Sequence, residues 1–149
     1  MHCDNGRSGR INTSSTLLES PYLPAVSAVQ IFNPELDDLI QLRDLSEFAL
    51  LYKLKLRYNS GKIYTRVGAV LVAVNPYESL PIFSEDTTMQ YVEHEGDARE
   101  LDPHVFGLAS IAYRLLLESG TNQAFLVSGE SGAGKTETTK LVLKVSRNS

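Results

Sequence analysis

An eight-residue segment near the end of the chain limits what this sequence can fold into more than any other feature. It reads Gly129, Glu130, Ser131, Gly132, Ala133, Gly134, Lys135, Thr136. An apolar run at 123–127 precedes it and a helical pattern begins at Lys135, so the order is strand, glycine-rich loop, helix. Glycines let successive N–H groups converge on an anion at a helix N-terminus. The spacing therefore predicts a phosphate-binding loop, in which Lys135 reaches the β- and γ-phosphates and Thr136 ligates Mg²⁺.

A plain glycine-rich turn between a strand and a helix is the alternative interpretation of this segment. It accounts for the glycines but not for a lysine and a threonine at these positions. Glu130 and Glu137 could act as general bases, yet a solvated loop carboxylate and a carboxylate in a first helical turn account for them equally well. We therefore name no catalytic residue.

Composition excludes several classes of protein. The 149 residues include 14 Lys and Arg against 18 Asp and Glu, a net charge of −4, which argues against nucleic acid as a partner. A hydrophobic content of 42% is typical of a globular domain. The single cysteine, Cys3, cannot form an intramolecular disulfide, and this favours a reducing compartment. No apolar run approaches the roughly 20 residues that span a bilayer, so we expect no membrane insertion.

The chain divides into a polar leader, 1–30, and an organised part, 31–149. Asp44 and Glu47 form a candidate capping box for a helix that ends around 59–61. Its apolar face is expected to carry Phe48, Leu51, Leu54 and Tyr58. The basic residues nearby are interpreted as a solvated surface rather than a binding patch; they are Lys53, Lys55, Arg57 and Lys62.

Two strands are predicted next, at 63–65 and 70–74, with a break near Gly68. The second is apolar throughout, which is typical of a strand buried on both faces, and it ends at Asn75 and Pro76. Helices are expected at 84–91, from Asp102 to Gly120, and from Lys135 onward. His94 lies in an acidic stretch that we interpret as a solvated loop, not as a metal site.

Four segments, in order, resemble the myosin motor family: DDLIQLRDLSE at 37–47, LVAVNPY at 71–77, DPHVFGLASIAYR at 102–114 and GESGAGKT at 129–136. The resemblance implies an α/β phosphate-loop NTPase fold with ATP and Mg²⁺ as ligands, and it places Asn75 and Pro76 near the adenine. It also implies actin filaments as the partner of the complete motor, in the cytoplasmic cytoskeleton. Phe83 departs from the family, because many members carry a tyrosine there. The hydroxyl contact of that tyrosine to the adenine is lost.

The sequence stops about one helix after the phosphate loop, so we expect an incomplete fold whose remaining sheet lies beyond Ser149. The family's two switch loops lie further downstream, and we expect no appreciable ATPase activity from these 149 residues alone. Val142 and Val145 are expected to lack their sheet, which favours a poorly folded or aggregation-prone product. Two alternatives stay open: another class of phosphate-loop NTPase, and a non-catalytic remnant that binds nucleotide or protein weakly.

Overall fold

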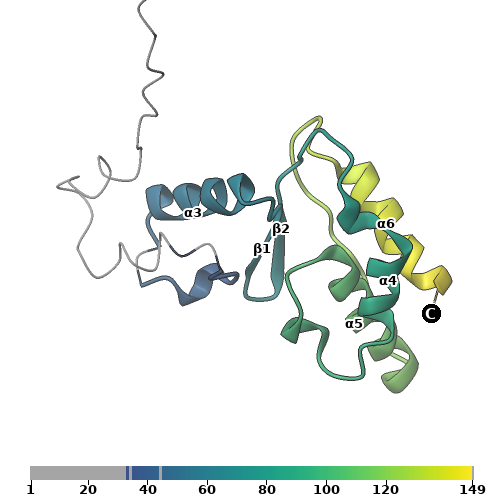
Figure 1. Cartoon of the computed structure of the whole chain (residues 1–149). Coiled ribbons are helices and arrows are strands. Elements are labelled where there is room, and N and C mark those ends of the chain that lie inside the picture. The colour runs from purple at the N-terminus through teal and green to yellow at the C-terminus, as the bar shows by residue number, and fades with distance from the viewer. Residues whose placement is uncertain (1–32, 34, 44, 149) are drawn as a thin grey trace, which may run out of the picture.

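A β-hairpin separates one helix from a group of three in the computed structural model, which describes residues 33, 35–43 and 45–148 (Figure 1). The predicted leader and Asp44 lie outside this part of the chain. Helix α3 (Glu47–Asn59) lies on one side of strands β1 (Tyr64–Val67) and β2 (Val70–Ala73). Helices α4 (Glu85–Val92), α5 (Val105–Ser119) and α6 (Lys135–Asn148) lie on the other. Three short 3₁₀ turns complete the list: η1 (Leu39–Gln41), η2 (Pro81–Phe83) and η3 (Ala98–Glu100).

The two strands pair antiparallel, with Tyr64 opposite Ala73 and Val67 opposite Val70. Gly68 forms the turn at a φ of +60°, which a glycine adopts without strain. The two predicted strands are therefore confirmed, with bounds shifted by one or two residues. The expected burial of the second strand on both faces is wrong here, because Val70 is 62% exposed and Leu71 and Val72 are only half-buried.

Helix α3 begins and ends close to the predicted positions. The Ser46 hydroxyl caps it by accepting from the Ala49 N–H at 3.3 Å. Its buried face differs from the prediction, however, since of the four predicted apolar residues only Leu54 is half-buried against the core. Ala49, Lys53 and Arg57, spaced four residues apart, form the buried face, whereas Phe48 and Leu51 are more than half exposed.

Two basic residues of α3 are thus buried, which corrects their interpretation as solvated. The Arg57 guanidinium donates to the Thr65 hydroxyl and the Tyr64 carbonyl, both at 2.9 Å. Lys53 donates to the carbonyl of Asn33. Burial lowers the pKa of Lys53 to about 8, because the charged ammonium is taken out of water. Only Lys55 of this helix keeps the solvent exposure that the sequence predicted for all three.

The three helices on the far side share one hydrophobic core with the start of the hairpin. Its buried members are Ile63, Tyr64, Tyr91, Val105, Phe106, Ala109, Val142 and Val145. Helix α6 packs mainly against α5. In the described residues Val142 and Val145 do not pack against a larger sheet, as expected, but both are buried because α5 and α4 cover them.

Helix boundaries in this half follow their capping residues. Ser84 caps α4 by accepting from the Thr87 N–H at 3.1 Å. His104 caps α5 through Nδ1, which accepts from the Phe106 N–H at 3.1 Å, so the helix begins two residues after the predicted Asp102-Pro103 start. Gly120 ends α5 in the left-handed conformation at a φ of +65°, as predicted. No described helix is long and apolar enough to cross a membrane.

The segment 121–130, between α5 and α6, forms neither helix nor strand. The strand predicted at 123–127 is therefore absent, and Leu126 is 96% exposed. A strand forms by hydrogen bonding to a neighbouring strand, and within the described residues β1 and β2 form a two-stranded sheet that this segment does not join. The segment is apolar, as the sequence shows, but it does not form the predicted strand.

Candidate functional site

The glycine-rich loop leads directly into α6 and depends on glycine at three positions. Gly129, Gly132 and Gly134 have φ values of +152°, +81° and +95°. Side-chain-bearing residues rarely adopt these angles. The Ala133 N–H donates to the Glu130 carbonyl at 3.2 Å and closes a turn within the loop. The conformation therefore explains why the glycines stand where they do.

Lys135 reaches back over the loop from the first turn of α6. Its Nζ donates to the Gly129 carbonyl at 2.8 Å and to the Glu130 carbonyl at 2.7 Å. The first N–H groups of a helix have no carbonyl partner within the helix, and the helix dipole favours an anion at this end. The Lys135 ammonium group and the first N–H groups of α6 thus belong to the same short stretch of chain.

Asn75 connects this loop to the end of the hairpin. Its side-chain Nδ2 donates to the Gly132 carbonyl at 2.8 Å, although the two residues lie 57 positions apart. Its Oδ1 accepts from the Tyr77 N–H at 2.9 Å, which orients the amide. Figure 1 shows the segment after β2 and the loop before α6 side by side at one end of the molecule. The structure therefore brings together the two segments that the sequence analysis singled out.

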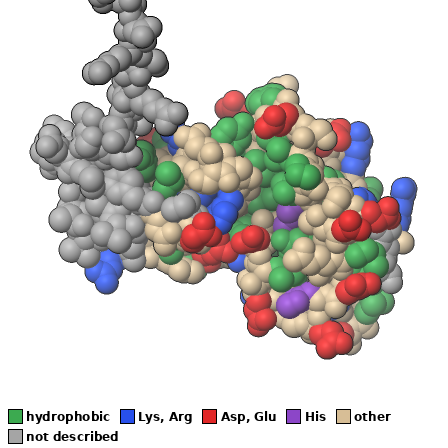
Figure 2. All heavy atoms as spheres, viewed as in Figure 1, with side chains coloured by type: hydrophobic (Ala, Val, Ile, Leu, Met, Phe, Trp, Pro, Cys, Tyr) green, Lys and Arg blue, Asp and Glu red, His purple; other side chains and the backbone are tan. Residues whose placement is uncertain are grey.

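A pocket of about 440 Å³ opens between these segments and α6. Its lining is mostly apolar, with a few charged residues at the helix; the lining residues are Ile63, Tyr64, Ala73, Val74, Asn75, Pro76, Glu78, Phe83, Ala133, Gly134, Glu137, Thr138, Lys140, Leu141 and Lys144. Its volume lies in the usual range for small-molecule sites. Figure 2 shows hydrophobic side chains gathered over the segment that joins β2 to α4.

Aromatic side chains form the wall of the pocket opposite α6. Phe83 meets Tyr64 edge to face, with ring centroids 6.5 Å apart, and the His104 ring lies 4.8 Å from Tyr64. Burial raises the pKa of Tyr64 to about 12 and lowers the pKa of His104 to about 4. Both rings are therefore neutral near pH 7.

Some of the other predicted site residues line the pocket and others lie outside it. Pro76, Ala133 and Gly134 line the pocket, whereas Glu130 and Ser131 are exposed outside it. Thr136 is exposed in the first turn of α6. Glu137 pairs with Lys140 at 2.7 Å, and both side chains are well exposed.

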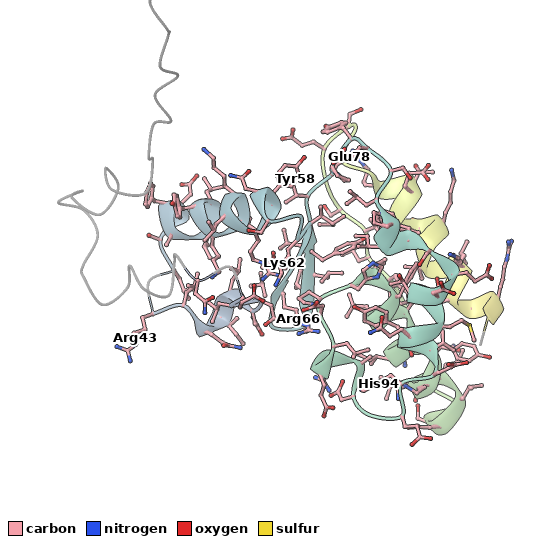
Figure 3. All side chains as sticks on the ribbon, in the orientation of Figure 1. Arg43, Tyr58, Lys62, Arg66, Glu78 and His94 are labelled. Atoms are coloured by element: carbon pink, nitrogen blue, oxygen red, sulfur yellow. The ribbon has the colours of Figure 1, made fainter. Side chains whose placement is uncertain are left out.

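The acidic stretch around His94 takes no part in this site. Figure 3 shows His94 at the opposite end of the molecule from Glu78, a residue that lines the pocket. The His94 Nε2 lies 3.8 Å from a carboxylate oxygen of Glu100. Among the described residues, no group of three or more His, Cys, Asp or Glu side chains could hold a metal ion.

Sequence reasoning missed Tyr64, Leu141 and Lys144 as pocket residues. A signal for two of them existed, because Glu137, Leu141 and Lys144 follow the spacing of a single helix face. Tyr64 had no such signal. Its place in the wall depends on the antiparallel pairing of β1 with β2.

Comparisons with known proteins identify the family. Residues 36–146 match the Myosin head (motor domain) family, and the chain therefore belongs to it. It is 44% identical over 115 residues to the Myosin-I heavy chain of Dictyostelium discoideum, covering 77% of this chain and 5% of that relative. Myosin-7 of Arabidopsis thaliana is 49% identical over 115 residues, which cover 74% of this chain and 6% of the relative. The Myosin-H heavy chain of Dictyostelium discoideum is 38% identical over 141 residues, or 95% of this chain and 7% of the relative.

The match confirms the resemblance drawn from the four sequence segments. The chain is a fragment-length part of a myosin motor domain, since it spans between 5% and 7% of these relatives. Its described part is a small α/β structure with a two-stranded sheet and four α-helices.

Proposed function

We propose that this chain is the nucleotide-binding portion of a myosin-type motor and that residues 129–136 hold the phosphates of Mg-ATP. The observation that carries the proposal is the hydrogen bond from Asn75 Nδ2 to the Gly132 carbonyl at 2.8 Å. It joins the glycine-rich loop to the segment that contains Pro76, and the pocket opens beside both. A nucleoside triphosphate has the same two parts, an anionic chain and an uncharged ring.

The phosphate end suits the loop. Lys135 supplies a cation that now contacts two loop carbonyls, at 2.8 and 2.7 Å. A phosphate oxygen offers this ammonium a stronger, charge-assisted hydrogen bond than a neutral carbonyl does. The first N–H groups of α6 supply further donors. Lysine and backbone together would bind the β- and γ-phosphates.

The metal ion would be held at Thr136. Mg²⁺ prefers oxygen ligands and usually keeps several waters, so a single threonine hydroxyl with phosphate oxygens is a typical protein contribution. The exposed place of Thr136 in the first turn of α6 agrees with this role. When bound, Mg²⁺ would neutralise charge on the phosphate chain.

The base would lie in the 440 Å³ pocket, with Pro76 and Phe83 as apolar neighbours and Asn75 at the junction with the loop. The Tyr64 and His104 rings, which lie against Phe83, are neutral near pH 7. For the complete motor, we propose actin filaments as the partner and the cytoplasmic cytoskeleton as the location. Both follow from the family to which the chain belongs.

Equilibrium titration of the chain with Mg-ATP tests the proposal. Lys135→Ala is expected to weaken binding by at least about 10-fold, because a charge-assisted contact to phosphate is lost. Lys55→Ala is the matched control, since Lys55 is an exposed lysine on α3, outside the pocket. Equal affinities of the Lys135→Ala variant and the unmodified chain would contradict the phosphate role. Tighter binding of Mg-GTP than of Mg-ATP would instead favour another class of phosphate-loop NTPase.

A further inference from the structure

Lys144 makes an unusual pair of contacts at the end of the pocket farthest from the glycine-rich loop. Its Nζ donates to the main-chain carbonyl of Phe83 at 3.0 Å, across 61 positions of sequence. The same nitrogen lies 5.6 Å from the centroid of the Phe106 ring, within the range of a cation–π interaction. Lys144 is half-buried, and no described carboxylate lies within ion-pair distance of it. Its charge is therefore directed to the wall of the pocket.

The turn that carries Phe83 is short and packs against the hydrophobic core. Turn η2 has three residues, and no side chain caps its N-terminus. Its one closing hydrogen bond runs from the Ser84 N–H to the Pro81 carbonyl at 3.1 Å. The Phe83 carbonyl thus stays available, and Lys144 occupies it. This bond fixes the aromatic wall against α6.

The neighbouring lysine makes a useful contrast. Lys140 lies one turn before Lys144 and also lines the pocket, but it pairs with Glu137 in solvent, with side chains 66% and 71% exposed. Exposed pairs of this kind contribute little to the arrangement of a site. Lys144, by contrast, joins α6 to the opposite wall through its bond to the Phe83 carbonyl.

Helix α6 carries both ends of the proposed site on one rigid element. Lys135 stands at the loop and Lys144 at the aromatic wall, nine residues apart, which corresponds to about 13–14 Å along a helix axis. Nine positions are about two and a half helical turns, so the two side chains leave opposite faces of the helix, and of the two only Lys144 lines the pocket.

We infer that Lys144 is a positioning residue that sets the width of the ring end of the pocket, so that the chain distinguishes a nucleoside triphosphate from a bare triphosphate. It acts through Phe83, whose ring forms the wall, and it contributes nothing to the phosphate contacts around Lys135. This inference rests on the proposed nucleotide site. Loss of the Lys144 contact frees η2 to move away from α6 and widens the space beside Phe83.

The test compares two ligands, Mg-ATP and Mg-tripolyphosphate, in equilibrium titrations of the chain. Lys144→Met keeps the length and the apolar stem but removes the ammonium. It is expected to weaken Mg-ATP binding by about 10-fold, the order expected for one hydrogen bond to a charged group, and to leave Mg-tripolyphosphate binding unchanged. Lys144→Arg keeps a cationic donor and is expected to restore Mg-ATP affinity to within about threefold. Arg147→Met removes a charge from an exposed position of the same helix and is the matched control.

Each outcome decides the matter. Selective loss of Mg-ATP affinity in Lys144→Met supports the inference, and intact tripolyphosphate binding shows that the variant is folded. Equal weakening of both ligands, no weakening of either, or an arginine variant as weak as the methionine variant overturns it. Failure of the unmodified chain to bind either ligand overturns the proposed nucleotide site and this inference together. The Lys144 variants test the inference alone, because they are compared with an unmodified chain that binds Mg-ATP.

Discussion

The side-chain amide of Asn75 donates to the main-chain carbonyl of Gly132 at 2.8 Å and holds the end of β2 against the glycine-rich loop. The oxygen of the same amide, Oδ1, accepts from the Tyr77 N–H at 2.9 Å, so the amide cannot rotate without losing a bond. Tyr77 has a φ of +54° and, among the described non-glycine residues, is alone in the left-handed region. The amide therefore supports an unusual backbone conformation as well as the loop.

Asn75→Ala is expected to weaken Mg-ATP binding by about 5- to 10-fold, because it removes the bond that orders the loop beside the pocket. Asn122→Ala, at an exposed position in the irregular segment before the loop, is the control. Titration calorimetry measures both variants. An Asn75→Ala variant with unchanged affinity would show that the contact to Gly132 has no part in nucleotide binding.

Gly132→Ala is expected to lower the free energy of unfolding by about 1–2 kcal/mol, because alanine is strained at a φ of +81°. An added Cβ would meet no atom within 4 Å, so the cost is conformational and not a clash. Gly61→Ala is a matched control, with a φ of +76° and equally open surroundings, outside the site. Urea unfolding should show similar losses for the two variants.

Mg-ATP affinity separates these two glycine variants. Only Gly132→Ala should weaken binding, since Gly61 lies at the C-terminal end of α3, away from the loop. Equal affinities of both variants would argue against a defined loop conformation in nucleotide binding.

Local signals in the sequence predicted the helices and the loop well, because each depends on residues close in sequence. Ser84 before α4 and Gly120 after α5 act through bonds within one turn of their helices. The glycine positions of the loop likewise reflect backbone angles at those residues. The bond between Asn75 and Gly132 was not predicted, since nothing local connects residues 57 positions apart, and the family resemblance placed Asn75 only near the adenine.

The failures concern burial, which depends on what packs against each element. The apolar run at 123–127 was predicted to be a strand, yet Phe125 and Leu126 are exposed because the described chain offers no neighbour to pair with them. Lys53 and Arg57 were predicted to be solvated, yet both are buried, since backbone carbonyls of Asn33 and Tyr64 accept their hydrogen bonds. A sequence pattern shows the polarity of a side chain but not the partner that it finds.

Arg57→Lys should destabilise the chain strongly despite keeping the charge. The guanidinium donates to Thr65 Oγ1 and the Tyr64 carbonyl at 2.9 Å and to the Leu36 carbonyl at 3.2 Å, and an ammonium cannot match this planar geometry. We expect a loss of about 2–4 kcal/mol in urea unfolding, since acceptors are left unsatisfied in a buried position. Lys55→Ala on the same helix should change stability by less than about 0.5 kcal/mol. Similar losses of unfolding free energy in the two variants would contradict the buried hydrogen bonds of Arg57.

His104 should make the chain sensitive to acid. Burial lowers its pKa to about 4 from an ordinary value of 6.5. Between these two pH values the unfolded chain binds a proton that the folded chain does not, so acid favours unfolding. Stability is expected to fall as the pH drops from about 6.5 to about 4, by on the order of 3 kcal/mol from this residue.

His104→Asn isolates this effect, because asparagine also caps a helix but does not titrate in this range. Urea unfolding at several pH values should give a flatter profile for the variant between pH 4 and 6.5 than for the unmodified chain. Parallel profiles would show that His104 takes up its proton in the folded state, which its contacts with Tyr64, Tyr91 and Phe106 argue against.

Because His104 stands behind Phe83, the same protonation would place a charge beside the proposed ring site. Mg-ATP affinity should therefore fall together with stability at low pH in the unmodified chain, and more steeply than in His104→Asn.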